Sequence, residues 1–252
     1  MNDAELFAVL DATVDAVRTA LGTVADRTGL GDRPGQYALD LVTDAAAVAV
    51  LVDAGLGVLS EESGRHHPDR GSWVVIDPVD GSTNASHGIP WYCTSLAVVD
   101  EDGLRAALVV NLVSGARYSA TRGGGAFKDG EPIKVTSTTE LSDALLILNG
   151  HVDRHLGWRQ FRVLGAAALD LCLVAEGVVD GYHDAVDVNL GPWDYLGGAL
   201  IVTEAGGVIS DAWDRPLLVD DITARRSPRA AATRELHDAI RAADPRDPAG
   251  AQ

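Results

Sequence analysis

The chain begins with two stretches whose apolar positions follow helical spacing. Residues 4–23 place apolar side chains three or four apart, at Leu6, Leu10, Val14, Val17 and Leu21. This spacing predicts an amphipathic helix. Gly and Pro in 24–35 predict a loop, and the Ala- and Val-rich run over 36–54 predicts a second helix.

From residue 56 onward the pattern changes to short apolar runs separated by turn signals, which indicates strands. Runs at 56–59 and 73–76 predict two buried strands, with a polar surface loop at 64–71 between them. Further runs predict an antiparallel meander at 96–99, 106–113 and 116–120, which residues 121–127 continue into a final hairpin at Asp129-Gly130.

After a polar hinge at 136–143 the pattern alternates between strand and helix. The predicted elements are strand 144–148, helix 166–176, strand 181–183, helix 193–204, strand 207–210 and a short helix near 234–242. We therefore expect an N-terminal α+β half with an antiparallel sheet at 1–140, and an α/β half at 141–243. The Pro-, Gly- and Asp-rich residues 244–252 predict a disordered tail.

Composition narrows the functional classes. The 252 residues are 46% hydrophobic and 23% charged, with a net charge of −17. Such an acidic chain is not expected to bind nucleic acid or an anionic membrane through bulk charge. No uninterrupted apolar run reaches the ~18 residues of a membrane span, and the N-terminus lacks a positive signal-peptide region, so we expect the cytoplasm. Cys93 and Cys172 have no metal-ligand spacing and predict buried, reduced thiols.

Residues 76–84 carry the strongest chemical signal, Ile-Asp-Pro-Val-Asp-Gly-Ser-Thr-Asn. Asp77 and Asp80 follow the apolar run at 73–76, so we expect both acids at a strand end, on a loop that Pro78 makes rigid. Residues 81–84 predict a tight turn into a helix start, where free N–H groups favour phosphate. Carboxylates beside an anion cradle indicate metal-assisted phosphate chemistry.

Two further acidic patches follow predicted elements. Glu61 and Glu62 come after the strand at 56–59, and Asp194 follows Pro192-Trp193 at a helix start. Taken alone, Glu61 and Glu62 are typical of a solvated surface pair, and Asp194 is typical of an ordinary residue at a helix start. Together with 77–84, their order and spacing resemble the inositol monophosphatase family. Supporting matches are Asp40-Leu41-Val42-Thr43, residues 123–127, residues 165–168, residues 180–182 and Glu204 to Gly207.

The resemblance implies a layered α-β-α-β-α sandwich of the inositol monophosphatase and fructose-1,6-bisphosphatase type. It also implies a lithium-sensitive, homodimeric phosphomonoesterase that uses two or three Mg²⁺ ions. Glu61, Asp77 and the Val79 carbonyl would hold the first ion, and Asp77, Asp80 and Asp194 the second, while a third would rely on Glu61.

Catalytic roles follow from the same resemblance. The backbone N–H groups of Gly81 and Ser82 would hold the phosphate, and Ser82 and Glu61 would orient the attacking water. Glu61, Asp77 and Ser82 are therefore the catalytic residues that it implies, with no covalent intermediate.

The chain departs from the family pattern mainly on the substrate side. Ala46 replaces an acid, with Asp44 nearby, and Gly35 stands near the place of a lysine. Ala166 replaces a threonine after Gly165. The stretch 183–193 is longer than usual, so the acid that contacts substrate hydroxyls is either Asp184 or Asp187. We expect Gly165 and Ala166 to lie near the substrate as well.

The expected partner is a small phosphorylated metabolite, with myo-inositol 1-phosphate first. Relatives also use histidinol phosphate, fructose 1,6-bisphosphate and 3′-phosphoadenosine 5′-phosphate, and the acids Asp184 and Asp187 suit the amine of histidinol phosphate. A metal- and phosphate-binding regulator without turnover is the alternative of another class, supported by Ala46 and Ala166.

Other motifs have weaker chemical readings. The triple glycine could form a phosphate loop, but a hairpin is favoured because no helix follows it. The pair His66-His67 could bind zinc, but we expect a surface loop. His87 is expected as an exposed turn residue.

Overall fold

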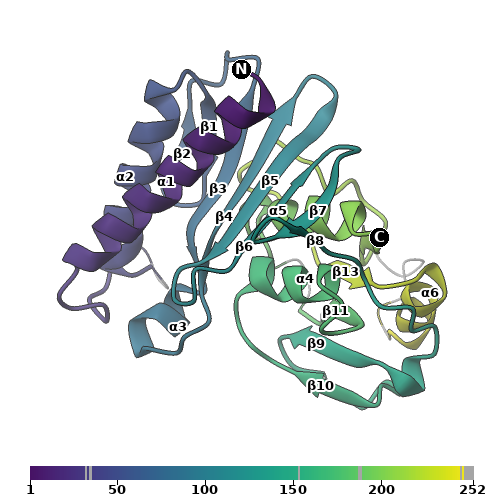
Figure 1. Cartoon of the computed structure of the whole chain (residues 1–252). Helices are drawn as coiled ribbons and strands as arrows, with labels where there is room; N and C mark the ends of the chain where they lie inside the picture. Colours follow the sequence, from purple (N-terminus) through teal and green to yellow (C-terminus); the bar gives the residue numbers. More distant parts are fainter. Residues whose placement is uncertain (32, 34–35, 153, 187–188, 245, 247–252) are drawn as a thin grey trace.

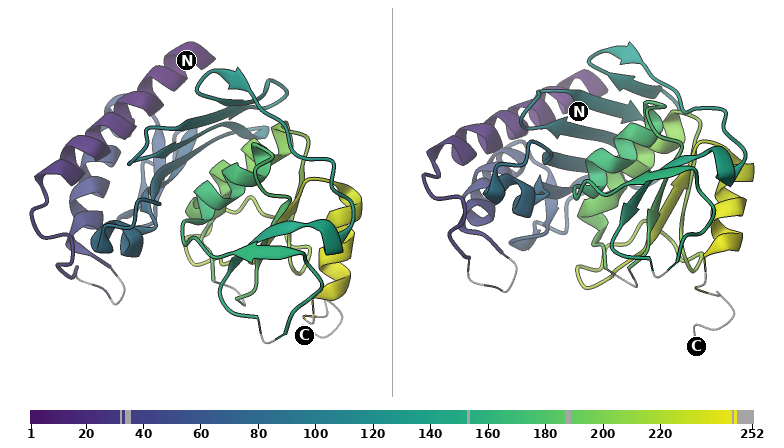
Figure 2. Two further views of the ribbon diagram at one scale, coloured as in Figure 1. Left: turned by 60° about the horizontal axis from the view of Figure 1, so that its bottom comes forward. Right: turned by 90° about the horizontal axis from the view of Figure 1, so that it is seen from below.

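The computed structural model describes residues 1–31, 33, 36–152, 154–186, 189–244 and 246. Layers of helix and sheet alternate through the molecule in the order α-β-α-β-α (Figures 1 and 2), which is the layering that the resemblance implied. Each inner layer is apolar on both faces, because it packs against another layer on either side.

The first sheet is mostly antiparallel and has the order β2-β1-β3-β4-β5-β6-β7-β8. Its strands are β1 (Gly57–Ser60), β2 (Gly64–His66), β3 (Trp73–Asp80), β4 (Cys93–Asp100), β5 (Gly103–Asn111), β6 (Arg117–Thr121), β7 (Gly125–Lys128) and β8 (Glu131–Pro132). The helices α1 (Asp3–Thr23) and α2 (Ala38–Asp53) cover its outer face. The buried face of α1 is the predicted stripe, which confirms the N-terminal helix.

The middle layer consists of α4 (Ala167–Ala175) and α5 (Pro192–Glu204), which lie between the two sheets (Figure 2). Both helices are buried around most of their circumference, as expected for helices with sheets on both sides. They cross closely at Gly198, where a Cβ atom would lie 2.6 Å from the Cβ of Leu171. The absence of a side chain at Gly198 therefore sets the spacing of this pair.

The second sheet has the order β10-β9-β11-β13-β12. Its strands are β9 (Leu145–Asn149), β10 (Gln160–Arg162), β11 (Gly181–Asp184), β12 (Val208–Asp211) and β13 (Pro228–Ala231). A 3₁₀ turn at Leu141–Asp143 precedes β9, and the expected division at residue 140 falls just before it. The outer face is covered by α6 (Arg234–Ala243), whose Leu236 and Ile240 pack on Leu146 and Leu148.

Three strands differ from the sequence-based expectation. The predicted loop at 64–71 is wrong at its start, because 64–66 form β2, which pairs antiparallel with β1. The short strands β10 and β13 were not expected at all. β10 is exposed along its length, and Pro228–Ala231 is buried along its length, so neither shows the alternation by which strands are recognised.

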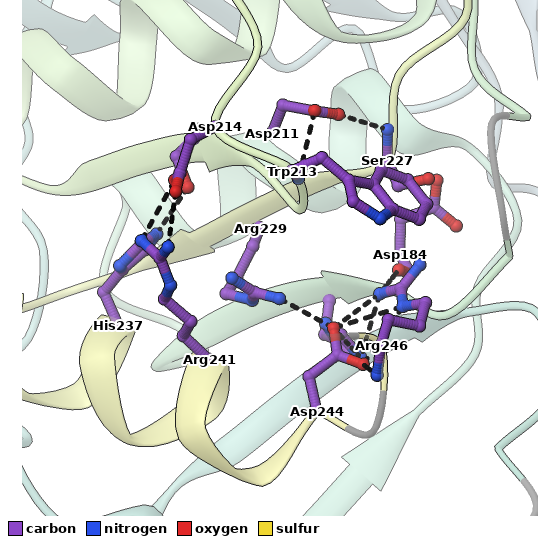
Figure 3. A network of polar contacts seen from close by, with 12 residues as sticks. Asp184, Asp211, Trp213, Asp214, Ser227, Arg229, His237, Arg241, Asp244 and Arg246 are labelled. Atoms are coloured by element: carbon purple, nitrogen blue, oxygen red, sulfur yellow. Dashed lines mark hydrogen bonds and ion pairs between the residues drawn. The ribbon is translucent and has the colours of Figure 1, made fainter. Parts of the chain in front are cut away.

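The expected disordered tail starts at Asp244, and the structure describes two of its residues. The Asp244 carboxylate lies 2.6 Å from Nη2 of Arg229 and 2.9 Å from Nη2 of Arg246 (Figure 3). Arg229 is only 1% exposed. Burial alone would raise the pKa of Asp244, but hydrogen bonds from Arg246 and nearby positive charges outweigh it and lower this pKa to about 2. Residues 245 and 247–252 lie outside the described residues.

Removing the charge of Asp244 should destabilise the fold. Asp244→Asn leaves the buried Arg229 guanidinium without its anion, and we expect a loss of about 3 kcal/mol in the free energy of unfolding at pH 7. Because the folded pKa is depressed, this stabilisation is present above the unfolded pKa of about 3.9 and is lost as pH falls towards 2.

Urea denaturation measures this loss, with Asp214→Asn as the matched control. Asp214 also pairs with an arginine, Arg241, but both side chains are exposed. We expect a change below about 1 kcal/mol in the control. Equal changes in both variants would show that burial of the Arg229 pair contributes nothing.

Candidate metal and phosphate site

The fold brings the three acidic patches of the sequence to one place. Strands β1 and β3 run parallel with Ser60 opposite Ile76, so Glu61 and Asp77 leave this pairing side by side. Asp194 enters from the first turn of α5 in the middle layer. Carboxylate oxygens of Glu61, Asp77 and Asp194 all lie within 4.8 Å of one another. Carboxylates this close repel one another unless protons or cations lie between them.

Asp77 and Asp80 lie inside β3, which corrects the expectation of a loop after the strand. The pairing with β4 shifts register between them, since Asp77 lies opposite Ser95 and Asp80 opposite Cys93. Such a bulge disturbs the regular alternation of side chains between the two faces. Oδ1 of Asp77 accepts a hydrogen bond from the Val79 amide at 2.9 Å, which fixes the turn of the bulge.

Asp80 uses both carboxylate oxygens at the start of α4. They accept hydrogen bonds from the amides of Ala167 at 3.2 Å and Ala168 at 2.7 Å. Among the described acids, the group that meets within 4.8 Å does not include Asp80. What the structure shows for Asp80 is therefore a capping contact between the two halves, at a helix end that favours negative charge.

Gly81 allows the turn that follows Asp80. Its φ of 88° lies in the left-handed region, and α3 (Ser82–His87) begins directly after it. A Cβ atom here would lie 3.1 Å from both the Ala166 Cβ and the Trp91 carbonyl oxygen. Nδ2 of Asn84 donates to the Leu164 and Trp91 carbonyls at 2.8 Å each. Gly165 and Ala166 therefore pack directly against the predicted phosphate cradle.

Burial and mutual repulsion raise the pKa values of four acids, Glu61, Asp77, Asp80 and Asp194. Burial is the larger cause and raises the pKa of Glu61 and of Asp80 to about 8 each, with neighbouring carboxylates adding to it. The pKa values of Asp77 and Asp194 lie well above their usual range for the same reasons.

The same acids fit a divalent cation. In the described part of the chain, no Lys or Arg forms an ion pair with any of these four carboxylates. The donor set consists of oxygen alone, which suits a hard ion such as Mg²⁺.

One of these four acids, Glu61, lines a cavity of about 650 Å³. It is lined by Arg33, Gln36, Asp40, Glu61, Glu62, Ser82, Trp193, Ile222, Thr223 and Arg225. Arg33 and Gln36 both donate to the carboxylate of Glu62. The sequence analysis missed Arg33, Gln36 and Arg225, since no motif marks them and they reach the cavity from segments far apart in the chain.

Of the two expected substrate acids, Asp184 does not line this cavity. Asp184 ends β11 and is fully buried, and its Oδ1 accepts from Nδ2 of Asn149 at 3.1 Å and from the Val186 amide at 3.0 Å. Asp187 and Gly35 lie outside the described residues. The acid near Ala46 supports the site from behind, because Asp44 accepts a hydrogen bond from Ser60, the residue before Glu61.

The remaining candidate motifs have structural roles in the described chain. The triple glycine forms the β6–β7 hairpin, as favoured, and the amides of Gly123 and Gly125 donate to Glu204 at 2.8 and 2.9 Å. His66 contacts the Ser63 hydroxyl at 2.7 Å. Cys93 and Cys172 are free and buried, which confirms that expectation. His87 is exposed, as expected.

Comparison with known proteins now gives this geometry a family. A family model described as the inositol monophosphatase family matches residues 36–245. The chain belongs to this family. It is 34% identical to phosphatase IMPL1, chloroplastic, of Arabidopsis thaliana, across 72% of this chain and 58% of that protein. It is 37% identical to inositol monophosphatase 3 of Solanum lycopersicum, across 68% of this chain and 67% of that protein.

The solved structures agree with this membership. An extragenic suppressor from Pyrococcus furiosus superposes with a TM-score of 0.84 at 26% identity, covering 95% of this chain and 100% of that one. The match thus spans less than two thirds of the Arabidopsis protein and nearly all of the Pyrococcus chain.

Within the described residues, none of the helices combines the length and the apolar character that crossing a membrane requires.

The cradle glycine gives a test of local packing. Gly81→Ala adds a methyl group to a crowded left-handed position, so we expect a loss of about 3 kcal/mol in the free energy of unfolding. Gly88→Ala is the matched control, because Gly88 is also left-handed (φ 74°) but no atom lies within 4 Å of a Cβ built there. About 1 kcal/mol is expected for the control by chemical denaturation. Equal losses would mean that Ala166 and Trp91 do not crowd Gly81.

Metal binding can be measured independently of catalysis. Mg²⁺ should raise the thermal midpoint of the EDTA-treated protein by about 5 °C or more at a hundredfold excess over Kd, because it binds only the folded cluster. Asp194→Asn should lose most of this shift, whereas the exposed Glu140→Gln should keep it. A shift of the same size in Asp194→Asn would place the ion elsewhere.

Proposed function

We propose that this protein is a Mg²⁺-dependent phosphoric monoester hydrolase that acts on a small phosphorylated metabolite. The observation that carries the proposal is the meeting of Glu61, Asp77 and Asp194 within 4.8 Å. This cluster opens through Glu61 into a cavity that Ser82 also lines, so a phosphate group can reach both acids and hydroxyl. Family membership supports the same reaction class.

The family pattern assigns a role to each residue. Glu61, Asp77 and the Val79 carbonyl would hold one Mg²⁺, and Asp77, Asp80 and Asp194 a second, with a third relying on Glu61. When bound, Mg²⁺ supplies Lewis acidity and lowers the pKa of a water molecule, so that no covalent intermediate is needed.

The protein's own groups then bind and orient. Ser82 and Glu61 stand on the cavity wall, where they can align the attacking water. Gly81 directly precedes α3 and Ser82 is its first residue, so the backbone amides of both can donate hydrogen bonds to the phosphate oxygens.

The substrate is proposed to be a phosphorylated polyol or sugar, with myo-inositol 1-phosphate as the reference. A histidinol phosphatase, the alternative based on Asp184 and Asp187, loses one of these two acids, because Asp184 is buried and hydrogen-bonded to Asn149. Fructose 1,6-bisphosphate and 3′-phosphoadenosine 5′-phosphate stay compatible with the cavity. Inhibition by lithium and a homodimer are proposed on the family resemblance alone.

Phosphate release tests this function. The purified protein should release inorganic phosphate from myo-inositol 1-phosphate with Mg²⁺, and EDTA should abolish the release. Asp77→Asn should lower kcat by about 1,000-fold or more, because Asp77 is assigned to both ions and the loss of developing-charge stabilisation is of this order.

Asp214→Asn serves as the control, since it removes one surface carboxylate outside the cavity. Full activity in EDTA, or in Asp77→Asn, would contradict the mechanism. Mg²⁺ binding without release from any of a broad set of phosphomonoesters would instead favour the non-catalytic regulator.

A further inference from the structure

Residues 220–226 form one wall of the cavity and join both sides of the site. Amide and carbonyl of Arg226 pair with those of Leu190, at 2.8 and 3.1 Å, just before α5 begins. At the other end Asp220 lies 3.5 Å from Arg65 of β2, and Ile222 lies close to Gly64. The wall is therefore tied to the element that carries Asp194 and to the hairpin that follows Glu61.

Within this wall the structure holds Arg225 in a fixed place. Its Nη1 donates to the Ile222 carbonyl at 2.9 Å and to the Ala224 carbonyl at 3.0 Å. Its guanidinium carbon lies 5.2 Å from the centre of the Trp193 ring, over its face. An arginine fixed by carbonyls and a ring keeps its positive charge available to a ligand.

Arg225 differs in this respect from its neighbours. Arg33 pairs with Glu62, and Arg65 pairs with Asp220. Among the described residues no carboxylate forms an ion pair with Arg225, although it lines the same cavity as Glu61 and Ser82. The cavity thus combines a cluster of acids, suited to cations, with an arginine on its wall whose charge reaches Asp194 without forming an ion pair with it.

We propose that Arg225 binds a second anionic group of the substrate, a carboxylate or phosphate other than the phosphate that is cleaved. The planar fork of arginine matches either group through paired N–H donors. Such a substrate is a phosphorylated sugar acid or a sugar bisphosphate, and myo-inositol 1-phosphate is a slower substrate by comparison. This inference rests on the proposed function and narrows its substrate class.

Two pairs of esters that differ in one anion test the proposal. 2-Phosphoglycerate is compared with glycerol 2-phosphate for a carboxylate, and fructose 1,6-bisphosphate with fructose 1-phosphate for a phosphate. In the full-length wild type with Mg²⁺, kcat/KM should favour the member with two anionic groups by about tenfold in at least one pair, and the pair that shows this preference identifies the anion.

Arg225→Gln should remove this preference, mainly by raising KM about tenfold for the ester that carries two anionic groups. Arg225→Lys, which keeps the charge, should retain the larger part of it. Arg226→Gln is the matched control, because its side chain donates to Pro216 and Arg225 carbonyls and does not line the cavity, so the preference should persist.

The outcomes separate this inference from the proposed function. If Arg225→Gln lowers kcat/KM equally for both esters of each pair, Arg225 acts on the cleaved phosphate. That result overturns this inference and leaves the proposed function intact. Absence of any preference in the wild type overturns it as well. No release from any ester overturns the proposed function and this inference with it. A circular dichroism spectrum and thermal midpoint like those of the wild type establish that each variant is folded.

Discussion

The mutual repulsion of buried carboxylates is the constraint on which the rest of this structure depends. Glu61, Asp77 and Asp194 meet within 4.8 Å, and the burial of Asp77 and partial burial of the other two remove much of the water that would screen them. Backbone amides offset part of this cost. Val79 donates to Asp77 and Gly191 donates to Asp194 at 2.6 Å, and a bound cation would offset more of the cost.

Holding such a cluster together requires a rigid frame on every side, and the layered architecture supplies one. Asp77 lies in a central strand of the first sheet, and Asp194 lies on a helix packed between two sheets. Asp80 connects these layers, since it belongs to β3 and caps α4. The site therefore forms only when the two halves are docked, and its geometry is a property of the whole fold.

The elements that the sequence revealed are those with a local pattern. The stripe of α1 and the apolar start of β3 follow from spacing alone, whereas the resemblance of the acidic patches to the family pattern placed Glu61, Asp77 and Asp194 in one site. Contacts between distant segments leave no such pattern. Asp80 caps α4 through Ala167 and Ala168, which follow it by 87 and 88 positions in the sequence. The short strand β13 is recognisable only by its pairing with β11 and β12. The burial of Asp184 and the position of Arg225 on the cavity wall also depend on contacts between distant segments, so no local pattern predicts them.

The acids of the reaction follow a local sequence pattern, whereas the residues that line the rest of the cavity are placed by contacts between distant segments. A cavity lined by Asp40, Glu61 and Glu62 repels any anion that the metal ions do not bind directly. A second anion is tolerated only if a cation faces it, and that cation is effective only if no carboxylate has already neutralised it. Arg225 lines the cavity, carbonyls and the Trp193 ring hold it in place, and no carboxylate of the described chain forms an ion pair with it, although its charge also opposes the rise in the pKa of Asp194. Its position depends on a loop remote in sequence from the acids, so specificity can change by altering that loop while the acidic cluster stays intact.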